Sequence, residues 1–197
     1  MSYADRDRSI SRRLVGFAVF VVAIPIMAIL LAIFVILKLL VLPFERPSHR
    51  SAEEVARDLR GFVDGTGGEW DFDDLTSIPL ADPRLESIRE RASAAFPGTD
   101  DAEWLSLAEE AEAIAAADRA NLIGLLRQAL GGDISGAMID EALPYPRSLG
   151  DRETKAYAAL SRWADDDDVR ARNLGYTERQ RAALAEQLAL LSAHPAP

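Results

Sequence analysis

The sequence LVGFAVFVVAIPIMAILLAIFVIL occupies positions 14–37 and contains no charged residue. As a helix it extends about 36 Å, because each residue adds about 1.5 Å. The hydrocarbon core of a bilayer is about 30 Å thick, so this helix is long enough to cross it with some tilt. The apolar sequence resumes after Lys38, whose long side chain places its ammonium group near the lipid headgroups. We therefore predict one transmembrane helix over residues 14–42, with the lipid bilayer as a partner.

Two other interpretations of this apolar run are less favoured. A cleaved signal peptide has an apolar core of about 7–15 residues, followed by a cleavage site with small residues. The run is longer than that, and the sequence LKLLVLPFERP at positions 37–47 offers no such site. A buried core helix of a soluble protein would be expected to carry a polar stripe, which residues 14–37 lack.

Basic residues on both sides of the span bear on its orientation. Four arginines precede it in a short tail, and five basic residues follow it at positions 38, 46, 50, 57 and 60. Positive charge close to a span favours the cytoplasmic side, and here the two counts are nearly equal. The tail lies directly against the span, which slightly favours the tail inside and the domain outside. We expect a single-pass protein of the cell (inner or plasma) membrane and leave the side of the domain open.

Charge is divided unevenly along the chain. Residues 1–50 hold seven Lys/Arg and three Asp/Glu, and residues 51–197 hold the remaining 15 and 29, a net charge of −14. An acidic domain repels phosphate backbones, so nucleic acid is not an expected partner. The acidity suits a basic protein partner and equally serves solubility. We divide the chain into a basic N-terminal tail (1–13), the span (14–42), a linker (43–50) and the acidic domain.

The sequence of the acidic domain predicts where two of its helices begin. Ser51 and Glu54 have the spacing of a capping box, and Asp82-Pro83 supplies the cap and first residue of another helix. Apolar residues follow both starts at helical spacing, and no segment alternates as a strand does. The predicted class is all-α: one transmembrane helix, then a small domain of about five to six short helices.

The remaining segments are assigned from apolar spacing and from breaker residues. A helix is expected from about residue 99 to 117, and it either continues to residue 131 or gives way to a further helix near residue 118. Others are expected over 152–164 and after a capping box at Thr177 and Gln180. Residues 69–80 are expected to be irregular, and residues 133–150 are expected to be a loop with one short helical turn. The aspartate run at 165–168 is expected to be a solvated loop.

One acidic segment, WDFDD at Trp70–Asp74, contains three closely spaced aspartates. Closely placed carboxylates such as Asp71, Asp73 and Asp74 bind Mg²⁺ or Ca²⁺, or perform acid–base chemistry. Their spacing does not match the calcium loop of an EF-hand. Aspartates in turns more often bond their own backbone and cap helices, while Trp70 and Phe72 pack inward. The structural interpretation is favoured.

No other pattern suggests catalysis. The chain has no cysteine, which excludes disulfides, thiolate nucleophiles and Cys-ligated metals. Its two histidines, His49 and His194, lie in the linker and the tail. We predict no catalytic residue, no cofactor and no metal site, and keep as a candidate interaction or structural motif the residues Trp70, Asp71, Phe72, Asp73, Asp74, Asp82 and Arg89.

The segment from Glu53 to Arg91 resembles a group of short, uncharacterised bacterial proteins. The likeness consists of a helix, a Gly-rich turn, a Trp-Asp-aromatic-Asp-Asp segment and a Ser-Ile-x-Leu-x-Asp-Pro-x-Leu-x-x-Ile-Arg segment. The matching positions are Gly67, Gly68, Trp70, Asp71, Phe72, Asp73, Asp74, Ser77, Ile78, Leu80, Asp82, Pro83, Leu85, Ile88 and Arg89. The resemblance implies a compact helical module and no particular activity, with residues 98–173 as an insertion. Members of the group have the character of cytoplasmic proteins, which favours the opposite orientation.

Three functional hypotheses follow from the sequence. The first is a membrane-anchored module for protein–protein interaction, because an anchor and an acidic helical domain occur without a catalytic set. The second is an immunity-type protein that neutralises a basic toxin, which the acidity suits. The third, less favoured, is a metal-dependent hydrolase that uses Asp71, Asp73 and Asp74.

Overall fold

The computed structural model describes Met27, Leu31 and residues 47–68, 71–95, 100–132 and 134–193, without the side chains of Asp71 and Phe72. Residues Pro47–Pro197 form one compact unit. Within the described ranges the structure is helical and has no strand, which confirms the predicted all-α class. The one extended pairing there is an isolated bridge between Ser48 and Leu80.

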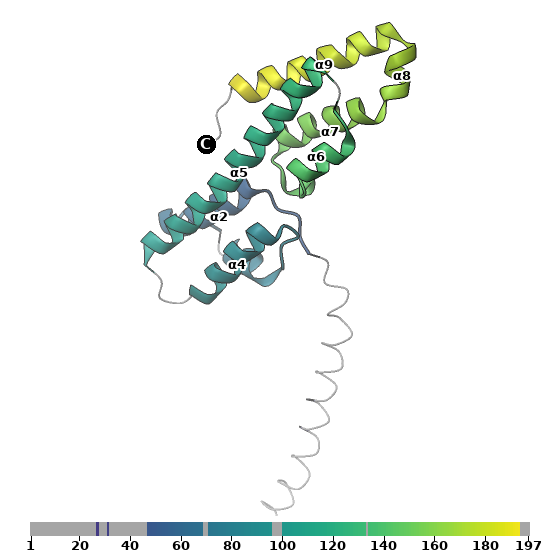
Figure 1. Cartoon of the computed structure of the whole chain (residues 1–197). Helices are drawn as coiled ribbons and strands as arrows, with labels where there is room; N and C mark the ends of the chain where they lie inside the picture. The colour runs from purple at the N-terminus through teal and green to yellow at the C-terminus, as the bar shows by residue number, and fades with distance from the viewer. Residues whose placement is uncertain are drawn as a thin grey trace, which may run out of the picture. The chain divides into compact units, whose positions relative to one another are not determined.

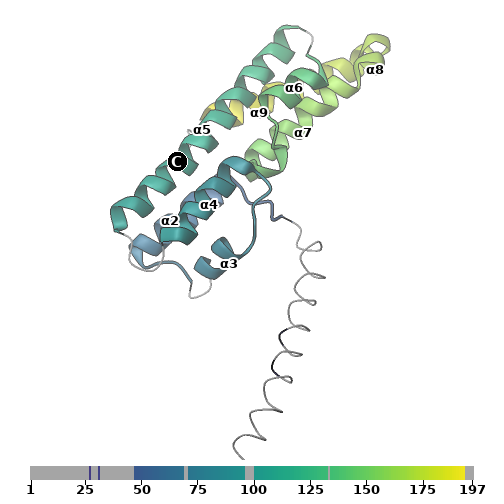
Figure 2. The ribbon, with the colours of Figure 1, turned by 60° about the horizontal axis from the view of Figure 1, so that its bottom comes forward.

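The helices of this unit are labelled in Figures 1 and 2. Their bounds are α2 Ala52–Asp64, α3 Asp71–Ser77, α4 Pro83–Ala95, α5 Asp101–Gly131, α6 Gly136–Ala142, the 3-10 helix η2 Pro146–Ser148, α7 Asp151–Asp165, α8 Asp167–Arg172 and α9 Leu174–Ala193. The predicted number of helices is therefore too small, since the described ranges hold eight α-helices. The prediction that all are short is also wrong, because α5 runs unbroken for 31 residues.

None of the helices in the described ranges is both long and apolar enough to cross a bilayer. The predicted span, residues 14–42, lies outside those ranges except for Met27 and Leu31.

Helix α5 connects the two halves of the helical unit. Figure 1 shows it running through the helical unit, with α2 and α4 beside one half and α6, α7 and α9 beside the other. At about 1.5 Å per residue its 31 residues extend about 46 Å. Its two halves contribute to two separate groups of buried apolar side chains, which we call the first core and the second core.

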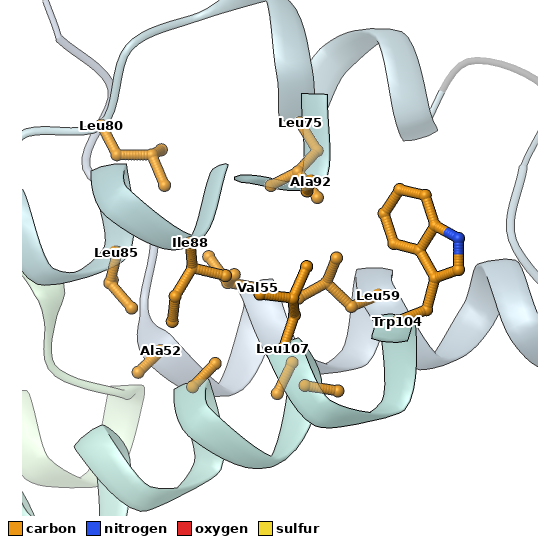
Figure 3. Packing of buried hydrophobic residues seen from close by; sticks show 13 residues of the cluster. Ala52, Val55, Leu59, Leu75, Leu80, Leu85, Ile88, Ala92, Trp104 and Leu107 are labelled. Carbon is orange, nitrogen blue, oxygen red and sulfur yellow. The ribbon is translucent and has the colours of Figure 1, made fainter. Parts of the chain in front are cut away.

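The first core lies between α2, α3, α4 and the N-terminal half of α5 (Figure 3). Val55 and Leu59 of α2 face Leu85 and Ile88 of α4, and all four side chains are fully buried. These positions recur at spacings of three and four, which places them on one face of each helix. Burial of one such side chain stabilises the fold by about 1.5–3 kcal/mol.

The second core joins the C-terminal half of α5 to α6, α7 and α9. Leu122 and Leu126 of α5 are fully buried, as are Leu160 of α7 and Leu184 of α9. The N-terminal positions of α6 are set by Ser135, whose hydroxyl accepts a hydrogen bond from Met138 N at 3.4 Å. The whole C-terminal part of the chain therefore folds back onto a helix that begins in the first core.

The helix starts predicted at Ser51 and Asp82 are confirmed. Ser51 N donates to Glu54 Oε2 at 2.8 Å, and Glu54 N donates to Ser51 Oγ at 3.2 Å, so the capping box is complete. Helix α2 ends at Gly65, whose φ of 65° is the left-handed conformation that glycine adopts without strain. Helix α4 begins at Pro83, directly after Asp82.

Four local predictions are wrong. The segment 69–80 contains helix α3, where the buried side chain of Leu75 supplies the tertiary contact that a short helix needs. The segment 133–150 contains α6 and η2 rather than one helical turn. Asp167 and Asp168 begin helix α8, where the helix dipole favours negative charge. Helix α9 begins at Leu174, ahead of the predicted capping box at Thr177.

Candidate functional site

The predicted aspartate motif does not gather into a site among the described residues. Trp70 lies outside them, and Asp71 and Phe72 are placed at the start of α3 without their side chains. The side chains of Asp73 and Asp74 are exposed on α3. Within the part of the chain that the structure describes, no three His, Asp or Glu side chains lie close enough together to hold a metal ion.

Asp82 has a structural role that explains its burial. Its side chain is 1% exposed and accepts hydrogen bonds from Arg84 N at 2.9 Å and from the Arg84 guanidinium at 2.7 Å. The same guanidinium donates two hydrogen bonds of 2.8 Å to Asp118 of α5. These bonds to Asp118 and Asp82 raise the pKa of Arg84 above its ordinary value. Arg84 therefore clamps the start of α4 to the middle of α5.

Arg89 ties α4 to the end of α3. Its guanidinium donates to both carboxylate oxygens of Glu86 at 2.7 Å and to the backbone carbonyl of Thr76. The Arg89 hydrogen bond lowers the pKa of Glu86, and Leu80 N, which donates to the same carboxylate at 2.7 Å, acts in the same direction. Arg89 thus positions α3 rather than facing a ligand.

A polar cleft of about 700 Å³ lies elsewhere, where the start of α2 meets the start of α7. Its lining consists of His49, Ser51, Glu53, Glu54, Arg57, Arg119, Arg147, Leu149, Gly150, Asp151, Arg152 and Thr154. None of the seven motif residues is among them. The volume lies within the range of about 300–1,000 Å³ that is usual for ligand pockets.

Four arginines from four different elements line this cleft: Arg57 of α2, Arg119 of α5, Arg147 of η2 and Arg152 of α7. Arg119 is only 6% exposed, and its Nε lies 3.3 Å from Glu153 Oε1. The other three arginines are exposed, and no carboxylate of a described residue lies within 4.0 Å of their guanidinium nitrogens. The cleft therefore offers three guanidinium groups that form no ion pair among the described residues.

The lining of the cleft also holds three carboxylates, Glu53, Glu54 and Asp151, of which Glu54 and Asp151 are exposed. A Cβ atom on Gly150 would stand 2.8 Å from Glu153 Oε2 and 3.0 Å from Glu53 Oε2, so a side chain at this position would displace these carboxylates. Glu53 and Asp151 accept no hydrogen bond from the described residues, whereas Glu54 is engaged with Ser51 N. The cleft therefore combines carboxylate acceptors with guanidinium donors, and one of these donors, Arg147 Nη1, lies 3.5 Å from His49 Nε2.

The start of α7 adds further donors. Gly150 is the N-cap of this 15-residue helix and has no side chain to satisfy the first backbone N–H groups. The N-terminal end of a helix carries a partial positive charge. The first turn of α7 also carries Asp151 and Glu153, which meet this partial charge within the helix itself.

The chain matches no protein-family model, no curated protein and no solved structure. The resemblance carried by the Trp70–Asp74 segment therefore stays a prediction.

The cleft arginines could not be predicted as a group from the sequence, because successive members are 62, 28 and 5 positions apart in the chain. One signal was present at Asp118-Arg119. These two charged residues stand between apolar residues of one helix, Ala111 and Leu122, at the spacing of its buried face. Charged residues on a buried helix face indicate a polar junction between two cores, and Arg119 of this junction lines the cleft.

Proposed function

We propose that the protein is a membrane-anchored, single-pass module whose helical domain binds a partner protein through the arginine-lined cleft. The observation that carries the proposal is the cleft itself, with three exposed arginines that have no described carboxylate partner. Arginine is enriched where proteins recognise one another, because its planar donor group pairs with carboxylates and stacks on rings.

The anchor rests on the uncharged run at positions 14–37. A helix of this length satisfies its own backbone hydrogen bonds and needs no water in the hydrocarbon core. The full-length chain should then resist extraction by carbonate and by high salt, because its attachment is hydrophobic. A chain that lacks residues 1–44 should be released. Intact wild-type protein in the soluble fraction would refute the anchor and leave the cleft untouched.

The two other hypotheses gain less from the geometry. Asp73 and Asp74 are exposed on α3 and do not line the cleft, so no concave site favours a metal-dependent hydrolase. An immunity-type protein would present its acidic surface to a basic toxin. The cleft presents exposed arginines, which do not favour that role.

Partner binding is tested by site-specific photo-crosslinking of the full-length chain in its own membrane. A photoreactive residue at Lys155, which is exposed and directly follows the cleft residue Thr154, should give a discrete adduct. The matched control is Arg181, an exposed position on α9 that does not line the cleft. Equal adducts at both positions, or none at Lys155, would contradict the proposal.

A further inference from the structure

We infer that the cleft binds one carboxylate of a peptide segment of the partner protein, a side-chain Asp or Glu or a chain terminus. The inference rests on the proposed function and assigns the chemistry of the ligand. It depends on the charge of the lining, on the distribution of donors and acceptors, and on the charge of the surrounding domain.

The charge of the lining disfavours a doubly charged ligand. Arg119 is paired with Glu153, and the three other arginines of the lining face three carboxylates, Glu53, Glu54 and Asp151, so the formal charges balance. A single carboxylate adds one negative charge to this balanced set. A phosphate ester carries about 1.5 to 2 negative charges near pH 7 and would leave the cleft with a larger excess of negative charge.

The rim of the cleft supplies the donors that a carboxylate needs. Arg147 and Arg152 lie on either side of Gly150, and Arg57 approaches from α2. A guanidinium presents two parallel N–H groups that match the two oxygens of a carboxylate.

The carboxylates of the lining fit the rest of a peptide. Glu53 and Asp151 accept no hydrogen bond from the described residues, and a peptide backbone brings N–H donors at regular intervals. A ligand made only of acidic groups would be repelled by these carboxylates. A segment with one carboxylate and several backbone N–H groups pairs with the arginines and with these carboxylates together.

The charge of the whole domain disfavours an anionic membrane as the ligand. Residues 51–197 carry a net charge of −14, and the cytoplasmic leaflet of a cell membrane carries negative lipids. The domain as a whole is repelled by such a surface, whereas a short peptide with one carboxylate presents a single negative charge to the domain.

The experiment compares two short peptides on the full-length chain in a neutral detergent. One peptide is Gly-Gly-Glu-Gly-Gly, blocked at its C-terminus and carrying a neutral fluorophore at its N-terminus, and the other has Gln in place of Glu. Fluorescence anisotropy should show the Glu peptide binding about tenfold more tightly, since a charge-assisted hydrogen bond is about twice as strong as a neutral one. The variants Arg147→Ala and Arg152→Ala should each weaken the Glu peptide severalfold and leave the Gln peptide unchanged.

The control variant Arg181→Ala removes an exposed arginine of α9 outside the cleft and should leave both peptides unaffected. Arg119 is not used because it is buried against Glu153, so its loss would disturb the fold. Equal binding of the two peptides, or binding that ignores Arg147 and Arg152, would overturn the inference. Tighter binding of inorganic phosphate, or of phosphatidylglycerol vesicles over phosphatidylcholine vesicles, through the same arginines would also overturn it.

The two proposals fail in different ways. If the Lys155 adduct forms but the Glu and Gln peptides bind equally, the interaction module stands and the assigned ligand chemistry is wrong. If no position-specific adduct forms but the Glu peptide binds through Arg147 and Arg152, the cleft recognises carboxylates and the partner-protein proposal is wrong.

Discussion

The two halves of α5 are covered by cores of different character. Around the first core, ion pairs connect separate helices: Arg60 of α2 donates two hydrogen bonds of 2.7 and 2.8 Å to Glu112 of α5. Arg91 of α4 pairs with Glu110 of α5 at 2.6 Å. Around the second core, Arg119 of α5 pairs with Glu153 of α7. The other described ion pair there, between Arg170 and Asp167, lies within α8. The first half of the domain therefore combines apolar burial with charge pairing, and the second half relies mainly on apolar burial.

The largest effects should come from the cores themselves. Ile88→Ala in the first core and Leu126→Ala in the second each remove a fully buried side chain, and each should cost about 2–5 kcal/mol. Urea denaturation followed by circular dichroism measures both. We expect one transition for the whole domain, because α5 belongs to both cores. Two transitions, with each variant shifting only its own, would show that the cores unfold independently.

The clamp at Arg84 should be the next most sensitive feature. Arg84→Met leaves two buried carboxylates, Asp82 and Asp118, without their counter-charge, and should cost about 3 kcal/mol. The double variant Arg84→Met with Asp118→Asn should recover part of the loss, because one uncompensated charge is removed. The free energy of unfolding from urea titrations decides this. A double variant less stable than Arg84→Met alone would count against a charge effect.

The ion pairs at the first core should have a smaller effect that depends on pH. Glu112→Gln should cost less than about 1 kcal/mol at pH 7, because the pair is partly exposed. The Arg60 hydrogen bond lowers the pKa of Glu112, and Arg89 lowers that of Glu86. A carboxylate with a lowered pKa stabilises the fold above its ordinary value of about 4.5, and this stabilisation disappears as the pH falls through the lowered value.

Thermal melts at a series of pH values test this dependence. The wild type should lose stability as the pH falls below about 4.5, and Glu112→Gln should lose less over the same interval. The variant Glu178→Gln, an exposed carboxylate of α9, serves as the control and should follow the wild type. Identical pH profiles for all three proteins would remove charge pairing as the distinction between the cores.

The smallest effect should come from the aspartates of α3. Asp73→Asn and Asp74→Asn should change stability by less than about 0.5 kcal/mol, since both side chains are exposed. Added Mg²⁺ or Ca²⁺ should not raise the melting temperature, because binding to the native state is what would raise it. A metal-dependent rise that disappears in both variants would restore the hydrolase hypothesis.

Local chemistry was the part of the fold that could be predicted. Ser51 with Glu54, and Asp82 with Pro83, start helices through bonds within a few residues, and both starts are found as expected. The short helix α3 could not be predicted in this way, because its stability depends on Leu75 being buried by elements far along the chain.

The cleft could not be predicted from the sequence. Arg57, Arg119, Arg147 and Arg152 come together only after α7 has folded back along α5, which no local pattern announces. The Trp70–Asp74 segment suggests chemistry because its aromatic and acidic residues are adjacent in the chain. Within it, Asp71 begins helix α3. The cleft, in contrast, is lined by residues that only tertiary contacts bring together.

The continuity of α5 has a consequence for how the domain exchanges its amide hydrogens with solvent. The backbone bonds between Ala111 and Leu122 lie where the first core ends and the second begins, and both of these side chains are fully buried. The opening of α2 and α4 alone, or of α7 and α9 alone, leaves this part of α5 held by the other core. Its amides therefore become accessible only in the rare event that both cores open together, and they should set the slowest exchange rate of the domain.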